Sequence, residues 1–496
     1  MKRKLTILWF RRDLRFEDNP LLKDLAGQFV LPLFVFDPFF FQWEETSHGR
    51  IQFLYQCLES LAGEFASRNS SMKFLYGNTA QVFDQLLASL SKDYTITIRY
   101  NYDVQIDYGL KRDKAIDAVA DTYGISVQKT RQNFWVAKGV EAKVWRDSYH
   151  DYMSKRLHKD DWSEVSRSTL PKLPNEIELV DIQAIHPSFF NLRPKMFAGG
   201  RQVGIARLNN FLEQDSKGYH WKMSRPYLAS LGATSHLSPH LTFGVFSTRE
   251  IYQKTLERIE YIAQNGSDYH KHVFSLRSFL ERLRWRNNFT IKLEHTPHLA
   301  DTNRFSEFDE VYNMNPLDDQ KQELYERWKT GTTGFALIDA SMRQLKKNGW
   351  MNFRMRAMNA SFLTIICGIS WQYGAVHFMN FLIDGDIAID SWQWQMQAGI
   401  TNPFSKTFRI YNPSRNIIER DPDLAYIKLF VPELSSVSLE DILEHEKAEE
   451  GLFGNRIGDY PSPMLNWNQS KNLNGSKVAK VRERVRKRLQ GLNVNQ

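Results

Sequence analysis

The stretch LTILWFRRDLR, residues 5–15, decides the fold of the N-terminal part of the chain. Its first six residues, Leu5–Phe10, are apolar and rich in β-forming types, which is typical of a buried strand. The turn that follows, Arg11–Arg15, carries three arginines and no glycine. A nicotinamide dinucleotide site requires Gly-x-Gly-x-x-Gly at this place, because glycine lets the backbone approach the pyrophosphate. The stretch therefore predicts a sheet strand and argues against a nicotinamide-binding site.

Four further β-rich runs follow within the first 130 residues, and segments of helical length separate them. Two of these helical segments are Ile51–Ser67 and Thr79–Leu90. Regular alternation of strands and helices is typical of βαβ units, which build a parallel sheet with helices on its faces. We predict an α/β, doubly wound parallel domain over residues 1–135. The four runs are Val30–Phe36, Met72–Tyr76, Thr95–Tyr100 and Ile125–Lys129.

Downstream of this domain the pattern changes twice. Between residues 136 and 200 the periodicity weakens and prolines punctuate the chain, so we predict a connector that lies on the surface. Beyond residue 200 the strand signal fades and helical spacing dominates. We predict an all-α domain over residues 201–496. Helical spacing occurs in the segments Val273–Leu293, Thr333–Lys347 and Arg354–Trp371.

Composition limits the classes of function. The chain has 496 residues, a net charge of +8 and a pI of about 9.1, which fits a polyanionic partner such as nucleic acid. Two cysteines are too few for a four-thiolate iron–sulfur cluster or a disulfide framework. The N-terminus has no apolar signal-peptide core, and the longest apolar stretch, Phe362–Trp371, is too short to cross a bilayer. We expect a cytoplasmic protein that does not enter a membrane.

The C-terminal segment predicts a basic amphipathic helix. Val478, Val481, Val485 and Leu489 fall at helical spacing, and lysines and arginines surround them. Two interpretations fit this pattern: a terminal helix docked on the domain with a solvated basic face, or a direct contact with nucleic acid. The apolar stripe favours docking.

Two segments carry polar groups suited to a ligand. Near Ser238 and Pro239, hydroxyls gather at a predicted helix start, with Ser238 as the cap, and free backbone N–H groups there can bind phosphate. Three carboxylates lie within Asp384–Asp390, and buried carboxylates need a partner, for which Arg356 is the candidate. A plain capped helix and a solvated acidic turn are the simpler alternatives. His236 and His240 have no evident third ligand, so we expect no metal.

Tryptophans flank the acidic segment. Trp392 and Trp394 follow it, and Trp371 precedes it. Each indole alone is most simply explained by core packing, but several together offer easily oxidised groups in one region.

Taken together, these segments resemble the photolyase/cryptochrome superfamily. The similarity extends in order along nearly the whole chain, and the chain ends soon after Tyr460–Pro463, without the long tail of signalling members. The resemblance implies an α/β antenna domain and a helical domain that holds FAD. The matching segments are Trp9–Arg15, Asp18–Pro20, Gly218–Tyr219, Thr234–Leu241, Arg282–Arg286, Thr333–Leu345, Gly349–Arg356, Asp384–Trp394 and Phe408–Pro413.

The resemblance assigns residues to the cofactor and to electron transfer. Trp392 and Trp371 match the first two members of an electron relay, and Asp390 matches the position beside the reactive ring nitrogen of the flavin. No tryptophan matches the third relay member, for which Tyr312 or Trp328 are candidates. The residues that would bind FAD are Tyr219, Thr234, Ser235, Leu237, Ser238, Arg286, Arg356, Asp384, Asp386 and Asp390.

The resemblance implies two activities that remain open at this point. The first is light-driven splitting of cyclobutane pyrimidine dimers in UV-damaged DNA by a monomeric enzyme. The alternative is a cryptochrome-type blue-light receptor. A second antenna chromophore, folate or deazaflavin, is also open, since segment 101–105 matches the folate-binding pattern loosely. The implied DNA contacts are Arg225, Arg343 and Arg354 at a phosphate-binding rim, with Trp285 and Glu281 at the dimer cavity.

Departures from the family pattern bear on this choice. Repair enzymes carry asparagine at the position of Asp390, and a buried aspartate with a raised pKa can hold a proton that asparagine cannot. Arg282 stands where repair enzymes usually carry a glutamate, with Glu281 adjacent. Ala357 and Phe353 replace a methionine and an asparagine of the usual cavity wall.

Overall fold

The computed structural model describes residues 2–104, 106–166, 172–191, 197–265, 269–405, 407–447 and 457–494. It divides into two compact units, which are described separately below. The first unit comprises Met1–Lys217, Ser235–Pro297 and Ile383–Ala388; the second comprises Gly218–Thr234, His298–Leu382 and Ile389–Gln496. Because both units contain several chain segments, the domain boundaries at 135 and 200 stay predictions.

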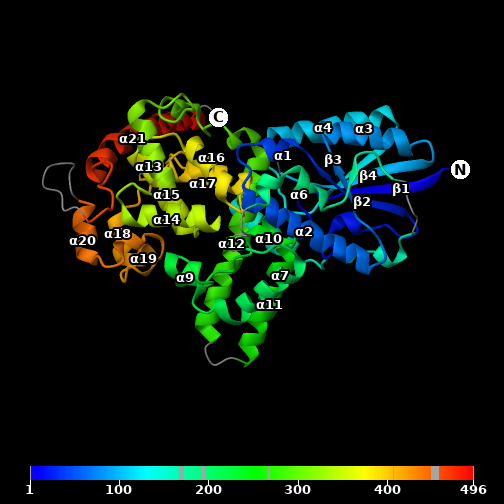
Figure 1. Cartoon of the computed structure of the whole chain (residues 1–496), viewed down its shortest axis with the longest axis horizontal. Helices are drawn as coiled ribbons and strands as arrows, with labels where there is room; N and C mark the ends of the chain where they lie inside the picture. The colour runs from blue at the N-terminus through cyan, green and yellow to red at the C-terminus, as the bar shows by residue number, and fades with distance from the viewer. Residues whose placement is uncertain are drawn as a thin grey trace. The chain divides into compact units, whose positions relative to one another are not determined.

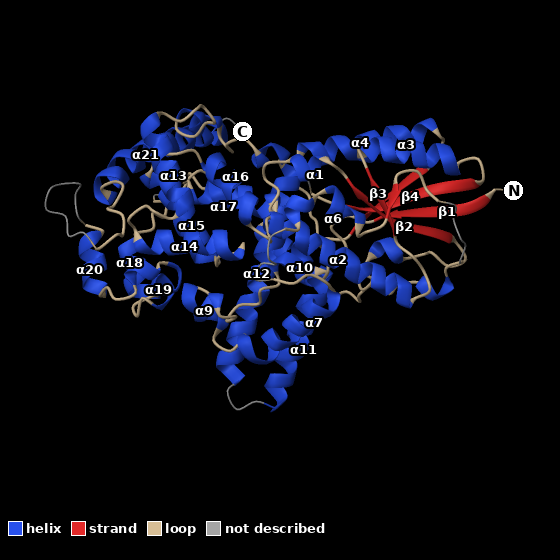
Figure 2. Cartoon of the chain, viewed as in Figure 1, coloured by secondary structure: helices blue, strands red, loops and turns tan. Residues whose placement is uncertain are grey.

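The first unit contains a six-stranded sheet with the order β5-β4-β1-β2-β3-β6 (Figure 2). The chain winds outward from β1 to β3 on one side, and then β4 and β5 extend the sheet on the other side of β1. All pairs among β1–β5 are parallel, which confirms the predicted doubly wound α/β fold. The five strands are Arg3–Trp9, Phe29–Phe36, Lys73–Tyr76, Tyr94–Tyr102 and Ser126–Arg131.

Helices cover both faces of this sheet (Figure 1). On one face, α3 (Thr79–Leu90) and α4 (Asp107–Thr122) bury Phe83 and Ile116 against Ile7 of β1. On the other face lies α2 (His48–Ser67). This alternation follows from the strand sequence, since successive residues of β1 point to opposite faces.

The prediction of a surface connector between residues 136 and 200 is wrong in part. Glu176–Ile177 forms β6, which pairs antiparallel with β3 at the sheet edge, and Leu173 and Ile182 are buried. The connector therefore contributes to the core, although proline punctuation had indicated a surface loop. Pro171 and Pro194 lie outside the described residues.

The second unit is helical and confirms the predicted all-α region. Its core joins α14 (Ala336–Asn348), α15 (Phe353–Ser361) and α16 (Trp371–Phe381). The other helices of eight or more residues that contribute are α13 (Asp319–Thr330), α17 (Ile387–Gln397, which begins in the first unit), α18 (Pro413–Arg420) and α21 (Trp467–Val494). None of the helices among the described residues is long and apolar enough to cross a membrane.

The segment Arg354–Trp371, which carries helical spacing, is helical but is divided between two helices, α15 and α16. After α15 it passes through a π-helical turn at Phe362–Ile366, and α16 begins at Trp371. Gly368 lies between them with φ of +65°, a left-handed conformation that ends a helix and that glycine adopts without strain. The break matters because it places Trp371 at the start of a new helix.

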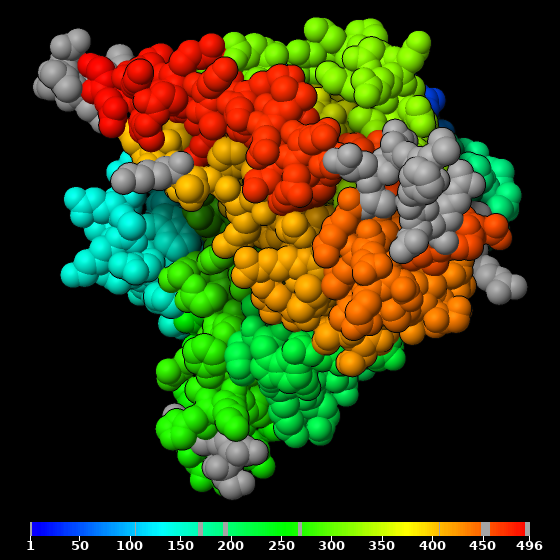
Figure 3. Space-filling model, turned by 90° about the vertical axis from the view of Figure 1, so that its left-hand side faces the viewer, coloured from blue at the N-terminus to red at the C-terminus, as the bar shows by residue number. Residues whose placement is uncertain are grey.

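The basic C-terminal helix α21 is docked on the second unit (Figure 3). Val478, Val481 and Val485 are fully buried. Arg482 donates to the backbone carbonyls of residues 399, 402 and 405, and Arg488 forms an ion pair with Glu307 at 2.5 Å. The docked interpretation is therefore confirmed.

The second unit contains a buried carboxyl group that will make stability depend on pH. Glu446 accepts a hydrogen bond from the Ala336 amide at 2.9 Å and another from the Ser414 hydroxyl. Burial raises the pKa of Glu446 from 4.5 to about 7. The folded state thus binds this proton more tightly than the unfolded state, so the stabilisation is fully present below pH 4.5 and is lost as pH rises through about 7.

We expect Glu446→Gln to remove this dependence. From pH 5 to pH 8, urea denaturation should show the wild-type protein losing up to about 3 kcal/mol more free energy of unfolding than the variant. Equal pH profiles for the two proteins would contradict the assignment.

Candidate functional site

The arginine-rich turn after β1 forms a buried polar hub at the carboxyl edge of the sheet. Arg11 donates to Asp113 at 2.8 and 3.0 Å, and Asp13 accepts from the Asn101 amide at 2.7 Å. Arg15 donates to the Gly244 carbonyl at 2.9 Å. These bonds satisfy charges that would otherwise be costly to bury. They explain why the turn is charged where a dinucleotide site would carry glycine.

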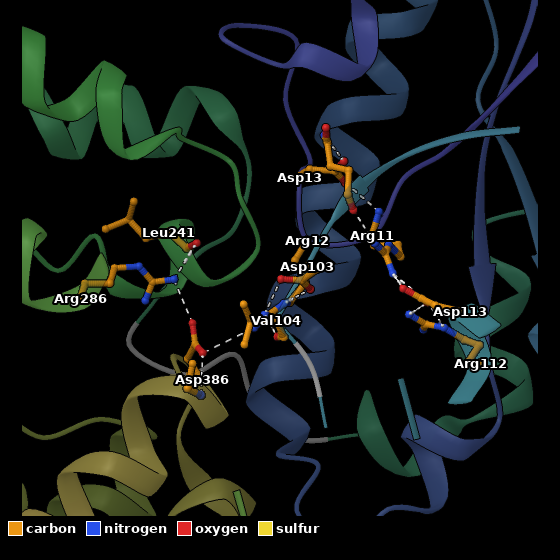
Figure 4. Close-up of polar contacts among 12 residues, drawn as sticks. Arg11, Arg12, Asp13, Asp103, Val104, Arg112, Asp113, Leu241, Arg286 and Asp386 are labelled. Carbon is orange, nitrogen blue, oxygen red and sulfur yellow. Dashed lines mark hydrogen bonds and ion pairs between the residues drawn. The ribbon is translucent and has the colours of Figure 1, made fainter. Parts of the chain in front are cut away.

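Arg12, in the same turn, points from the sheet toward Asp386 (Figure 4). Its Nε and Nη2 atoms donate to the two carboxylate oxygens of Asp103 at 2.7 Å each, and Nη2 also donates to the Val104 carbonyl at 2.9 Å. Asp103 directly follows β4, the strand that pairs with β1. Strand pairing thus brings together two residues that lie 91 positions apart.

Asp386 lies between two guanidinium groups. Arg286, from α12 (Tyr269–His295), donates through Nη2 to Asp386 Oδ2 at 2.9 Å and to the Leu241 carbonyl at 3.2 Å. Arg12 Nη1 lies 3.7 Å from Asp386 Oδ1, an ion-pair distance rather than a hydrogen bond. Burial acts to raise the pKa of Asp386, but the charges of Arg12 and then Arg286 hold it below its usual value.

A small polar pocket adjoins this cluster within the first unit. Its volume is about 40 Å³, enough for a few water molecules and far below the size of a flavin ring system. Three arginines, two aspartates and several hydroxyl and amide groups line it. The lining residues are Arg12, Arg15, Asp103, Gln132, Asn133, Leu241, Thr242, Gly244, Phe246, Ser247, Thr248, Arg286, Asn287, Thr290 and Asp386.

The predicted phosphate-binding segment is built differently from the sequence prediction. Ser238 is the first residue of α10 (Ser238–Thr242) rather than its cap, and Leu237 at the cap position makes no side-chain capping bond. Instead, Ser235 Oγ accepts from the Leu237 amide at 3.5 Å, and the Ser235 carbonyl accepts from Arg207. Close by, the Thr242 hydroxyl donates to the Asp384 carbonyl at 3.2 Å.

The two histidines of this segment serve packing. The His236 ring lies edge-on to Phe197, with centroids 5.3 Å apart. His240 is buried against Phe53, and burial lowers its pKa to about 4, so the ring is neutral at physiological pH.

The two predicted relay tryptophans lie in the second unit and contact neighbouring residues of one loop. Trp371 donates its indole N–H to the Asn303 side chain at 2.8 Å. The guanidinium of Arg304 lies 5.0 Å from the ring centroid of Trp392. Both indoles are buried, as is Asp390 in the first turn of α17.

Both candidates for a third relay residue are fully buried. Tyr312 donates its hydroxyl to the Ala398 carbonyl at 3.1 Å, and its own carbonyl accepts from the Asn303 amide, which also bonds Trp371. Trp328 packs 6.3 Å from Trp394, between centroids. The Asn303 side chain therefore links the Trp371 indole to the backbone of Tyr312.

Three other residues predicted to bind FAD, Tyr219, Arg356 and Thr234, also lie in the second unit. Tyr219 is buried at the start of α8 (Tyr219–Lys222), directly after Gly218 in the left-handed conformation with φ of +77°. Arg356 donates from Nε to the Met351 carbonyl at 2.9 Å. Thr234 is the last residue of its segment in this unit.

The arginines predicted to contact DNA differ in their partners within the protein: two pack on aromatic rings, and one forms an ion pair. In the second unit, Arg354 packs on Phe353 and Tyr411, with its guanidinium 5.4 and 5.6 Å from the ring centroids. Arg225 lies 5.4 Å from the exposed Trp221 ring. By contrast, Arg343 forms an ion pair with Glu433 at 2.7 Å and donates to the Gly331 carbonyl.

In the first unit, Trp285 is exposed on α12, and Arg282 packs over its ring at 4.7 Å. Glu281 is held by an ion pair with Arg284. The Glu281 carboxylate is thus paired with an arginine of the next turn of the same helix.

The structure adds residues that the sequence did not single out. Arg409 donates to the Tyr411 hydroxyl at 3.1 Å, and Arg420 lies near the Ser224 hydroxyl at 3.4 Å, so both join the cationic and aromatic group around Arg354. Arg12 and Asp103 join the Asp386 cluster. The signal that could have indicated Arg12 is its place in a charged turn at the carboxyl end of a parallel strand, where α/β proteins bind ligands.

Comparison with known proteins agrees with this architecture. Residues 6–156 match the family model described as DNA photolyase, and residues 279–480 match the FAD binding domain of DNA photolyase. Together, the parallel α/β sheet and the helical region with this match define an FAD-binding protein of the photolyase type. The chain belongs to the photolyase/cryptochrome family, and its cofactor is FAD.

The similar proteins include both photolyases and cryptochromes. A deoxyribodipyrimidine photo-lyase of Synechococcus sp. is 28% identical over 93% of this chain and 94% of its own length. Cryptochrome-2 of Gallus gallus is 28% identical over 97% of this chain and 84% of its own length. The crystal structure of an archaeal photolyase from Sulfolobus tokodaii with two FAD molecules superposes with a TM-score of 0.75 at 25% identity, covering 95% and 99% of the two chains.

The donor groups of the first unit fit FAD. The described contacts of Arg286 use only Nη2, which leaves Nη1 and Nε of a partly exposed guanidinium available to a ligand acceptor. The Asp386 carboxylate, held charged by two arginines, fixes the direction of that guanidinium. This arrangement suits the polar edge of a flavin ring.

Proposed function

We propose that this protein is a light-dependent DNA photolyase that splits cyclobutane pyrimidine dimers. When bound and reduced, FAD would supply light-driven electron donation to the dimer; two carbon–carbon bonds of the cyclobutane ring would break and the electron would return, so the reaction would consume no net reductant. The observation that carries the proposal is the cationic and aromatic group of the second unit. It consists of Trp221, Arg225, Phe353, Arg354, Arg409, Tyr411 and Arg420.

This group has the chemistry that DNA binding requires. Guanidinium groups bind phosphate oxygens, and exposed aromatic rings stack on bases that leave the duplex. Trp221 and Phe353 are 44% and 43% exposed, so both rings are accessible to a base at the surface. The net charge of +8 adds long-range attraction to DNA.

We propose that the family's FAD residues keep their roles here. In the first unit, Ser235, Leu237, Ser238, Arg286, Asp384 and Asp386 would contact FAD; in the second unit, Tyr219, Thr234, Arg356 and Asp390 would do so. Trp392 and Trp371 would carry electrons to the flavin. The chain's part in the reaction is to bind and orient the cofactor, to hold the dimer out of water and to position charge.

The second candidate function is a blue-light receptor, and Asp390 is the observation that favours it. The carboxyl group is buried in the first turn of α17, where repair enzymes carry an amide. A carboxylic acid can donate a proton to a neighbouring group, and an amide cannot. Glu281, the nearest substitute for the missing cavity glutamate, is engaged by Arg284, which also favours this candidate.

We expect Asp390→Asn to change the photochemistry of the oxidised protein. If Asp390 donates a proton after light-driven electron uptake, the wild-type protein will show a light-induced visible absorption change that persists in the dark. The variant will lack that change or lose it at least about tenfold faster, since general acid catalysis contributes 10²–10⁴-fold. Identical spectra and dark decay rates in the two proteins would remove the argument for the receptor.

Removing one guanidinium from the cationic group should weaken DNA binding. We expect Arg354→Gln to reduce affinity for damaged and undamaged DNA alike by about tenfold, and to lower the slope of log K against log salt by about one. Fluorescence anisotropy at several salt concentrations measures both quantities.

Arg343→Gln is the matched comparison, because it removes the same charge from a guanidinium that Glu433 already neutralises. We expect a smaller loss and little change in slope. Equal effects would instead support the prediction that Arg343 contacts DNA directly, whereas no effect of Arg354→Gln would reject this surface as the DNA interface.

A further inference from the structure

We propose that Arg12 is a positioning residue for the flavin site: fixed by Asp103 at the carboxyl edge of the sheet, it keeps the Asp386 carboxylate charged and aimed at Arg286. The inference rests on the proposed function in one respect, the placement of Arg286 and Asp386 at FAD.

The position of Arg12 is determined by the sheet rather than by the cofactor. The Asp103 carboxylate holds its guanidinium in a bidentate arrangement, with two bonds of 2.7 Å, and the Val104 carbonyl accepts a third bond. Bidentate arginine–carboxylate pairs fix orientation as well as charge. Because β1 and β4 are paired strands, the turn after β1 and the residue after β4 meet at the carboxyl edge of the sheet, where this clamp lies (Figure 4). The remaining Nη1 atom is thereby directed at Asp386 Oδ1.

The two oxygens of Asp386 divide their contacts between two arginines. Oδ2 accepts from Arg286, while Oδ1 faces Arg12 at 3.7 Å and accepts from the Ala388 amide at 3.2 Å. The Asp386 side chain is only 4% exposed, so water does not screen these charges effectively. The cluster of two guanidiniums and two carboxylates is neutral overall, and neutralising Arg12 would leave one net negative charge beside Arg286.

Arg12 also lowers the proton affinity of Asp386, together with Arg286. The charged groups that line the adjoining pocket are Arg12, Arg15, Asp103, Arg286 and Asp386. Burial acts to raise the pKa of Asp386, and Arg12 is the strongest of the charges that lower it. A lowered pKa keeps the carboxylate charged as pH falls. Without Arg12 the pKa rises, and Asp386 takes up a proton at a higher pH, which releases Arg286 from its partner.

The experiment compares FAD binding across pH in full-length variants. We expect Arg12→Gln to weaken FAD binding by about tenfold at pH 8 and by a further factor that grows toward pH 5, whereas wild-type binding changes little over that range. Arg12→Lys keeps the charge and should restore a flat profile. The control is Arg11→Gln, which breaks the buried Arg11–Asp113 pair of the same turn without removing a charge that faces Asp386.

A double variant separates positioning from general loss of structure. If Arg12 acts through Asp386, then Arg12→Gln will have no further effect on FAD binding in an Asp386→Asn background, and the pH dependence will vanish. A flat profile for Arg12→Gln, equal effects of Arg12→Gln and Arg11→Gln, or additive effects in the double variant would overturn the proposal. If Arg12→Gln does not fold, Asp103→Asn releases the clamp and takes its place in each comparison. Failure of the wild-type protein to bind FAD would instead reject the proposed function.

Discussion

Asp386→Ala will lose FAD, with an affinity more than about 100-fold below that of the wild-type protein. The substitution leaves two guanidiniums, those of Arg286 and Arg12, facing a cavity where the carboxylate had been. Truncating one partner of a buried, hydrogen-bonded charge pair at a binding site costs about 2–5 kcal/mol of binding free energy, and about 2.7 kcal/mol corresponds to 100-fold in affinity. The loss should appear as colourless purified protein and as weak binding of added FAD, measured by fluorescence quenching.

Asp113→Ala is the matched control for this prediction. Asp113 also accepts from two arginines, Arg11 and Arg112, and it is similarly buried in the same unit. Both variants should be less stable than the wild-type protein, but only Asp386→Ala should lose the cofactor. If the two variants retain FAD equally well, Asp386 does not take part in binding it.

Gly244→Ala will destabilise the first unit by about 3–5 kcal/mol. Gly244 has φ of +66°, a conformation that strains any residue with a Cβ atom. An added Cβ would also lie 2.1 Å from the Arg12 carbonyl oxygen and 2.7 Å from the Asp13 Cα. Since both contacts are backbone atoms of the arginine-rich turn, no side-chain rotation can relieve them. Thermal or urea denaturation measures the loss.

Gly63→Ala is the control in the same unit, and it should raise the free energy of unfolding rather than lower it. Gly63 lies on the exposed side of α2 with nothing within 4 Å of an added Cβ. Alanine there should stabilise the protein by about 0.4–1 kcal/mol, because it favours the helix and limits the unfolded chain. A Gly244→Ala protein as stable as the wild type would mean that the turn is not held against Gly244.

Local signals predicted the sheet well. Strand β1 was predicted as Leu5–Phe10 and spans Arg3–Trp9. The apolar run that indicated it is followed directly by the charged turn, which marks its end. Helix α3 matches its predicted range at both ends, and the Asn78 side chain caps its first turn. These elements are encoded by neighbouring residues, so a single sequence suffices to find them.

Features that depend on long-range packing were missed. Strand β6 has only two residues and exists because β3 offers an edge to pair with. The break between α15 and α16 depends on the left-handed Gly368, and a lone glycine inside a helical pattern did not decide it in advance.

The candidate site shows the same division. Asp386 and Arg286 were predicted from motifs, but Arg12 and Asp103 come together only because β1 lies beside β4. The pairing of Arg343 with Glu433 likewise required the packed structure.

The central claim is that light absorbed by this flavoprotein repairs DNA, and dimer splitting tests it most directly. In this experiment the FAD bound to the purified protein is first fully reduced. The protein is then mixed in stoichiometric amounts with single- and double-stranded DNA that contains cyclobutane pyrimidine dimers, and the mixture is exposed to blue light. We predict that dimers disappear in the light and persist in a dark control. Dimers that persist in the light, while FAD remains bound and fully reduced, would contradict the photolyase assignment.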